Sequence, residues 1–145
     1  SVSAAETRRV DTPGGWMVEA AHDSYMPALG IRHERQVTLA PQGLSLTGSD
    51  RLVPSVKQKP GGVGFAIRFH VHPEVRVSLS QGGDVILKLS NGEGWRFRSS
   101  APVTVEESVY LGGDTLRRTE QLVLTGSVGD NAADVAWIFE QIGRE

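Results

Sequence analysis

The chain has 145 residues, of which 39% are hydrophobic and 22% are charged, and its formal net charge is −2. This length suits one domain with a substantial core, and the slightly acidic charge excludes a globally basic surface that coats nucleic acid. The absence of cysteine excludes disulfides, thiol nucleophiles and cysteine metal sites, and no apolar stretch is long enough to cross a membrane. We therefore expect neither nucleic acid nor a membrane as a partner. The chain begins at Ser1 without a signal peptide and reads as part of a longer protein.

Short runs that alternate apolar and polar residues, separated by glycine-containing turns, predict strands along the whole chain. In chain order these runs are 16–20, 31–40, 44–47, 65–72, 75–79, 85–89, 95–97, 103–111, 116–127 and 132–142. The pair Glu106-Glu107 interrupts the alternation of its run. The last run is ambiguous, because Asp130 could begin a helix, but the alternation of Trp137 and Phe139 favours a strand.

The connections between these runs carry their own signals. The dipeptide Asn91-Gly92 predicts a tight turn, and the segment 57–62, which is rich in lysine, proline and glycine, is the best candidate for a mobile loop. About ten strands at short, regular spacing, without a convincing helix, predict an all-β fold, namely an antiparallel β-sandwich. No domain boundary is visible, so residues 1–145 form one domain in this interpretation.

The run from Phe65 to Pro73 alternates most strictly. Because successive side chains of a strand point to opposite sides, its large apolar residues should face the core. The other face then presents Arg68, His70 and His72 together. A His-x-His pair on a strand suits a shared metal, but a site needs three or four protein ligands and the spacing of further ligands does not fit, so we predict no metal and no cofactor. A polar, partly solvated sheet face is the simpler interpretation.

Arginines recur on the predicted outward faces of three strands, at Arg68, at Arg96 and Arg98, and at Arg117 and Arg118. If these strands are neighbours, the arginines form a basic stripe suited to an anionic polymer, since guanidinium groups pair bidentately with carboxylate and sulfate. Alternatively, Glu106, Glu107 and Glu120 pair with them across strands, which carries little functional meaning. The sequence alone favours this pairing.

The segment 21–25 brings His22, an aspartate and Tyr25 close together in the sequence, a combination that could serve acid–base chemistry. The alternative is a strand that ends in an Asx turn. No serine lies in a Gly-x-Ser-x-Gly elbow, and no glycine-rich run has the features of a phosphate loop, so we assign no catalytic residue.

Several of these segments, in the same order, resemble the C-terminal part of heparinase II/III-like proteins, most closely those of proteobacteria. The segments that carry the resemblance are 21–25, 30–35, 46–52, 65–73, 92–98, 106–111 and 117–124. The family consists of polysaccharide lyases with an N-terminal helical toroid and a C-terminal antiparallel β-sandwich, which cleave uronic-acid-containing glycans by β-elimination. The resemblance implies that this chain supports a toroid and forms one wall of a cleft for an acidic polysaccharide. It also implies a periplasmic or secreted location, if the parent is a lyase.

The resemblance has consequences for the site residues as well. The family's catalytic tyrosine and its partners come from the toroid, and its His-x-His-x-Asp metal motif has no counterpart upstream of His22. The resemblance therefore implies that this chain alone has no lyase activity. The candidate substrate-binding residues are His22, Tyr25, Arg68, His70 and His72.

Two other functions stay open. A stand-alone carbohydrate-binding module needs an exposed aromatic platform, whereas Trp16, Trp95 and Trp137 lie on predicted core faces. A purely structural interaction domain, whose partner is another part of the same polypeptide, would show an exposed apolar patch on one sheet.

Overall fold

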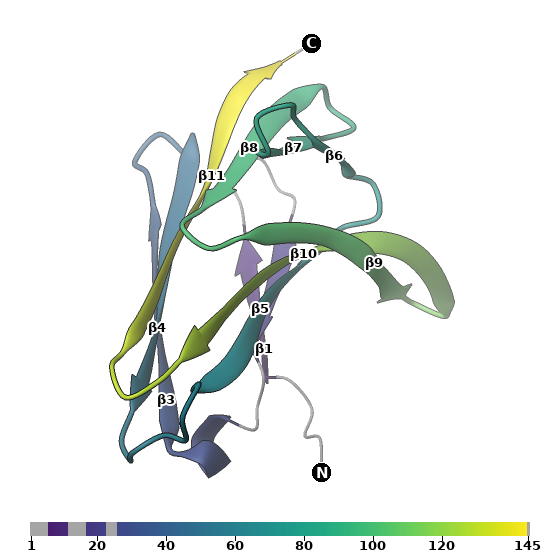
Figure 1. The fold of residues 1–145 in the computed structure, drawn as a ribbon. Coiled ribbons are helices and arrows are strands. Elements are labelled where there is room, and N and C mark those ends of the chain that lie inside the picture. Colours follow the sequence, from purple (N-terminus) through teal and green to yellow (C-terminus); the bar gives the residue numbers. More distant parts are fainter. Residues whose placement is uncertain (1–5, 12–16, 23–25, 145) are drawn as a thin grey trace.

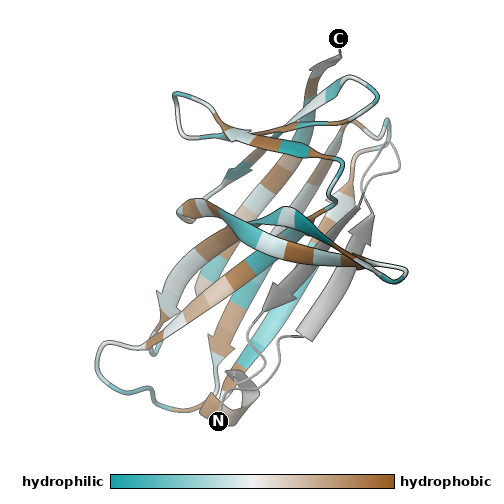
Figure 2. Cartoon of the chain, turned by 90° about the vertical axis from the view of Figure 1, so that its right-hand side faces the viewer, coloured by the Kyte–Doolittle hydropathy of each residue, from teal (hydrophilic) through white to brown (hydrophobic). Residues whose placement is uncertain are grey.

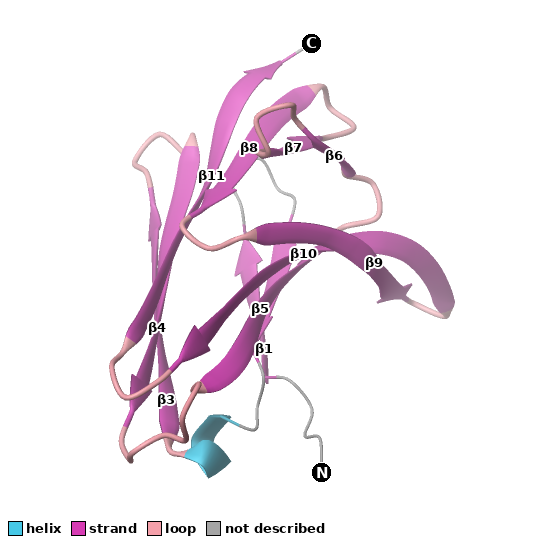
Figure 3. Ribbon diagram, viewed as in Figure 1, coloured by secondary structure: helices cyan, strands magenta, loops and turns pink. Residues whose placement is uncertain are grey.

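The computed structural model describes residues 6–11, 17–22 and 26–144, which fold into two antiparallel sheets packed face to face (Figure 1). The predicted all-β antiparallel sandwich is therefore confirmed. Strands dominate the described residues, and the helical element among them is the single 3-10 turn η1 (Met26–Leu29) (Figure 3). In this part of the chain no helix has the length and hydropathy to span a bilayer.

The first sheet contains five strands in the order β1-β2-β5-β10-β9. Their bounds are β1 (Glu6–Asp11), β2 (Met17–His22), β5 (Val63–Val71), β9 (Val103–Gly112) and β10 (Thr115–Val128). All neighbours pair antiparallel, and β5 lies at the centre between β2 and β10.

The second sheet contains six strands in the order β3-β4-β11-β8-β7-β6. Their bounds are β3 (Ile31–Leu39), β4 (Ser45–Pro54), β6 (Arg76–Leu79), β7 (Val85–Lys88), β8 (Glu93–Ser99) and β11 (Ala133–Arg144). The ambiguous C-terminal run is thus a strand, and it pairs with β4 on one side and β8 on the other. Val135, Trp137 and Phe139 all point from it into the core.

The core lies between the two sheets, and the alternating hydropathy of the strands is visible in Figure 2. Phe69 of β5 stands at its centre, with ring centroids 4.9 Å from Trp137 and 5.6 Å from Phe139, both edge-on. Trp95 and Trp137 are only 1% and 3% exposed, so the prediction that these two tryptophans face the core is confirmed. Trp16 lies outside the described residues.

The predicted turns follow the rules of backbone geometry. Gly92 has a φ of +90°, as the tight turn predicted at Asn91-Gly92 requires. In the β9–β10 hairpin, Thr115 pairs with Gly112, and Gly113 has a φ of +62°, which a type II′ turn needs at its first central position. The segment 57–62 is a loop as predicted, and it is anchored at Gln58, whose backbone N–H donates to Asp130 at 2.8 Å.

Candidate functional site

The outer face of the five-stranded sheet holds the predicted row of polar side chains. Arg68 and His70 are on β5, and His72 follows directly after the strand. Because successive side chains of a strand point to opposite faces of the sheet, these three side chains lie on the face away from the buried Ile67 and Phe69. All three are half-buried, so each keeps part of its surface in contact with solvent.

Arg68 is held loosely by two neighbours. Its Nη1 donates to Oε1 of Gln121 on β10 at 3.3 Å, and it lies 3.7 Å from Oε1 of Glu106 on β9. Both charged groups are partly exposed, so this ion pair contributes about 1 kcal/mol or less. The guanidinium charge of Arg68 is therefore available to an anion that binds from solvent.

His70 reaches across the neighbouring strand. Its Nδ1 lies 2.8 Å from the hydroxyl oxygen of Ser108 on β9, although β10 separates the two strands. The hydroxyl of Thr119 on β10 donates to the backbone carbonyl of Val71. These bonds tie the side chains of three strands into one surface.

His72 lies at the end of the row, beside Tyr110 of β9. The two ring centroids are 5.1 Å apart and the ring planes are tilted by 60°. The backbone N–H of Glu74 donates to Nδ1 of His72 at 3.1 Å, so Nδ1 is an acceptor and the proton of the neutral ring is on Nε2. We call the surface formed by Arg68, His70, His72, Ser108 and Tyr110 the polar row.

The structure brings together only part of the predicted substrate-binding set. Arg68, His70 and His72 share the polar row. The Cα of His22 pairs with that of Ile67 in the β2–β5 register, and its side chain is not described. Tyr25 lies outside the described residues.

Ser108 and Tyr110 were missed by the sequence analysis. They belong to β9, and the regular β9–β10 register keeps them on the same sheet face as Arg68. The only sign in the sequence was the interruption of the alternation at Glu106-Glu107. Beyond this point the large apolar residues of β9 are exposed and do not belong to the core.

The predicted basic stripe forms only in part, because Arg117 on β10 lies in the same sheet as Arg68 on the neighbouring β5, whereas Arg96 and Arg98 do not. Arg68 lies in the five-stranded sheet and Arg96 in the six-stranded sheet, so their strands are not neighbours. Glu140, which the sequence analysis did not consider, accepts hydrogen bonds from Arg96 at 2.7 Å and from Arg98 at 2.8 Å. The hydrogen bond from Arg96 is the largest influence that holds the pKa of Glu140 below its ordinary value.

Cross-strand pairing is confirmed for two of the predicted glutamates. Glu106 lies near Arg68, and Glu107 lies 3.7 Å from Arg118, where both side chains are almost fully exposed. Within the described ranges, no group of three or more histidine, aspartate or glutamate side chains is placed to hold a metal ion.

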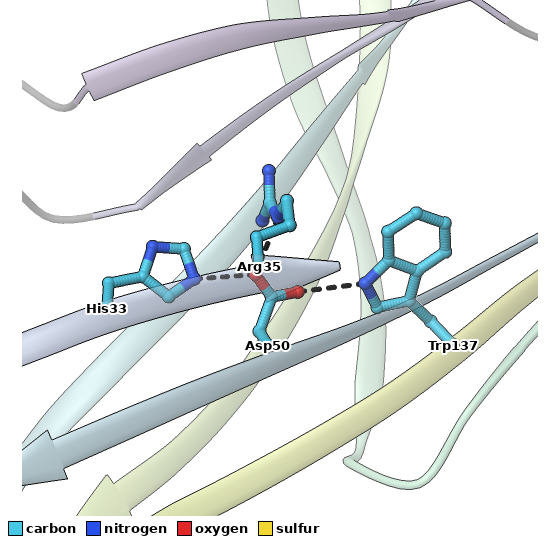
Figure 4. A network of polar contacts seen from close by, with 4 residues as sticks. All are labelled: His33, Arg35, Asp50 and Trp137. Atoms are coloured by element: carbon cyan, nitrogen blue, oxygen red, sulfur yellow. Dashed lines mark hydrogen bonds and ion pairs between the residues drawn. The ribbon is translucent and has the colours of Figure 1, made fainter. Parts of the chain in front are cut away.

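A second polar cluster lies inside the sandwich (Figure 4). Oδ1 of Asp50 on β4 is 2.6 Å from both Nε2 of His33 and Nε of Arg35 on β3, and its Oδ2 accepts from the indole N–H of Trp137 on β11 at 2.8 Å. Asp50 is 0% exposed. Burial alone would raise its pKa, but the hydrogen bonds from its three neighbours and the charge of Arg35 outweigh burial and lower the pKa.

This buried cluster connects strands rather than binding a ligand. His33 and Arg35 come from segment 30–35 and Asp50 comes from segment 46–52, so two of the segments that carry the family resemblance meet here. Both carboxylate oxygens of Asp50 are hydrogen-bonded to side chains of neighbouring strands. The cluster therefore fixes β3 and β4 to the core, and the polar row is the candidate site.

Comparisons with known proteins fit this architecture. The sequence model of the family described as heparinase II/III-like, C-terminal, matches residues 2–138. FtsZ-localized protein C of Caulobacter vibrioides is 30% identical in an alignment 141 residues long, which covers 91% of this chain and 24% of that protein.

Solved structures show the same fold. Heparan sulfate lyase HepC from Pedobacter heparinus superimposes with a TM-score of 0.66 and 11% identity, over 97% of this chain and 22% of that one. A heparinase III superimposes with a TM-score of 0.60 and 13% identity, over 99% of this chain and 22% of that one. The chain thus spans less than a quarter of the length of the proteins it matches.

Proposed function

The chain belongs to the family of heparinase II/III-like C-terminal domains, and we propose that it is the C-terminal β-sandwich domain of a heparinase II/III-like polysaccharide lyase. In this role it supports an N-terminal helical toroid and forms one wall of the cleft that holds an acidic glycan. The observation that carries the proposal is the polar row, in which Arg68, His70 and His72 share one solvent-facing surface.

The chemistry of β-elimination explains why such a wall needs a cation. The reaction removes the proton beside a uronate carboxylate, and that carbon becomes acidic only when the carboxylate charge is neutralised. Arg68 can pair bidentately with a carboxylate or a sulfate. Its present contact with Glu106 is long and partly exposed, so an incoming anion can compete for it at little cost. The Nε2–H of His72 adds a second donor to the same surface.

We expect the chain alone to have no lyase activity, because the family's catalytic residues come from the toroid. The test is incubation with heparan sulfate and with several alginates while the absorbance of the unsaturated product is followed. A flat trace is expected in every case, with an active lyase as the positive control. Clear turnover by the isolated chain would contradict this part of the proposal.

Binding of the glycan can be tested separately from catalysis. We expect Arg68→Gln to lower the affinity for immobilised heparan sulfate about tenfold or more, because a charge-assisted pair is lost. The matched control is Arg32→Gln on the six-stranded sheet, where Arg32 pairs with Glu34 and is well exposed. Binding by the unchanged chain should weaken as salt is added. Equal loss in both variants, or equal retention on a neutral glycan, would count against an anion-binding wall.

A second candidate function is favoured by one comparison. The relative at 30% identity is a protein named for its localisation with FtsZ, whereas the solved lyases are 10–13% identical. In this alternative the sandwich is an interaction module of a protein that localises with FtsZ. Binding of purified FtsZ to the immobilised chain, measured by biolayer interferometry, would favour the alternative. Absence of binding together with retention on heparan sulfate would favour the lyase domain.

A further inference from the structure

The hairpin formed by β9 and β10 extends beyond the two packed layers. Figure 1 shows it curving away from the sandwich toward the turn that joins β9 to β10. The register between β9 and β10 is regular along the whole hairpin, so each of its two faces continues unbroken from the sandwich to the tip. The face that supplies the buried residues Leu122 and Leu124 is therefore the same face that continues onto the extension.

On the part of the hairpin that extends beyond the two packed layers, this face is apolar but exposed to solvent. Val109, Leu111 and Leu116 are 63%, 64% and 68% exposed, although Leu111 and Leu116 pair directly across the hairpin. A charged pair, Glu107 with Arg118, separates these three side chains from the core. We call Val109, Leu111 and Leu116 the hairpin patch. A contiguous apolar surface with a polar rim is typical of an interaction site.

The opposite face of the hairpin is fastened to the domain. Ser108 bonds to His70, and the ring of Tyr110 contacts that of His72. The extension is therefore held at a defined angle to β5, and the hairpin patch is presented on its far side. A surface that binds a rigid partner needs such an orientation.

The edge of β9 is not suited to pairing with another strand. β9 is the last strand of its sheet, but its exposed glutamates, Glu106 and Glu107, carry negative charge at this edge. Charged side chains on an edge strand oppose the addition of a further strand. The hairpin thus offers a partner its apolar face and not its edge.

The length of the related proteins favours one partner for the hairpin patch, namely another part of the same polypeptide. This chain spans 24% of FtsZ-localized protein C and 22% of the heparan sulfate lyase, so about three quarters of each relative lies outside it. We propose that the hairpin patch is the docking surface for the remainder of the parent polypeptide, through an apolar area flanked by charges that complement Glu107 and Arg118. The polar row lies on the other face of the same hairpin, so docking on the hairpin patch leaves the polar row uncovered.

This inference rests on one part of the proposed function, namely that the sandwich adjoins a larger domain of the same polypeptide. It does not depend on which glycan binds, or on whether any glycan binds. A failure of glycan binding and a failure of docking are therefore distinguishable, since each is measured without the other.

The test uses single cysteines, because the chain has none of its own. Leu111→Cys and Leu116→Cys place a thiol in the hairpin patch, and Leu44→Cys, at a half-exposed position in the connection between β3 and β4, is the matched control. Each variant is prepared as the present chain and as the longer polypeptide that contains it. The rate of maleimide labelling at each cysteine is then measured by mass spectrometry.

We expect labelling at positions 111 and 116 to be roughly tenfold slower in the longer polypeptide, because thiol reactivity depends on exposure. Labelling at position 44 should be the same in both forms. Equal rates in both forms at positions 111 and 116 would overturn the proposal. Protection that is already present in the short chain and rises with its concentration would also overturn it, since a second copy would then cover the hairpin patch.

Discussion

The molecule contains two clusters built from the same residue types, and their comparison shows what burial does to them. In the interior cluster Asp50 is 2.6 Å from both His33 and Arg35. In the outer polar row Arg68 is 3.7 Å from the adjacent Glu106. Inside the sandwich every carboxylate oxygen has a protein partner, because an unpaired buried charge is costly. On the surface the ion pair between Arg68 and Glu106 is long, and water competes for it. The same chemistry therefore stabilises the fold in one place and stays available for a ligand in the other.

The largest expected effect comes from breaking the buried cluster. Asp50→Ala should destabilise the domain by about 3–5 kcal/mol, because it leaves the charge of Arg35 buried without its partner. Asp134→Ala is the control, since Asp134 pairs with Arg51 at the surface, where about 1 kcal/mol or less is expected. Urea unfolding measures both. Similar losses in the two variants would remove the distinction between the clusters.

The packing beside the buried cluster provides a second test. The indole of Trp137 lies against Gly48, and a Cβ added at Gly48 would be 2.0 Å from its Cζ2. Gly48→Ala should therefore cost about 1–3 kcal/mol through overpacking. Gly64→Ala on β5 is the control, because the nearest atom to its new Cβ is 3.9 Å away. A thermal melt in which both variants match the unchanged chain would show that Trp137 is free to move.

The buried cluster should also make the stability of the domain sensitive to acid. The pKa of Asp50 is lowered in the folded state, so its contribution to stability is full above the unfolded value near 3.8 and is lost as the pH falls through the folded pKa. The free energy of unfolding should fall as the pH drops below about 5. In Asp50→Asn this dependence should be weaker, and the remaining slope includes Glu140, whose pKa is also lowered. An unchanged slope in the variant would assign the acid sensitivity to other groups.

The smallest effect on stability is expected in the polar row. Arg68→Gln should change the free energy of unfolding by about 0.5 kcal/mol or less, because its ion pair is long and partly exposed. The same variant is expected to bind anionic glycan poorly. Urea unfolding of the variant alongside the unchanged chain measures the first quantity. A large loss of stability would mean that Arg68 is a structural residue like Arg35.

Much of the fold could be predicted because strand alternation encodes faces. The alternation from Phe65 to Val71 correctly assigned one side of β5 to the core, and the glycine at position 92 correctly marked a tight turn. Alternation does not encode which strands are neighbours, because register and strand order depend on contacts between distant segments. For this reason Arg68 and Arg96 could not be assigned to different sheets from the sequence.

The site was predictable only in part for the same reason. Arg68, His70 and His72 belong to one short segment, so a local pattern found them, whereas Ser108 and Tyr110 reach the row through a second strand and a specific register. The buried cluster did have a signal. Asp50 alternates in phase with the core residues Leu46 and Leu52, and a charge at such a position indicates a buried pair.

In the proposed function, the polar row is the anion-binding wall of the sandwich. The most direct measurement is a heteronuclear NMR titration of the chain with heparan sulfate oligosaccharides at low and at high salt. We expect backbone shift changes concentrated at residues 66–72, 106–110 and 117–121, which reverse as salt is added. Shift changes confined to the face that carries Arg96 and Arg98, or none at any residue, would contradict the claim.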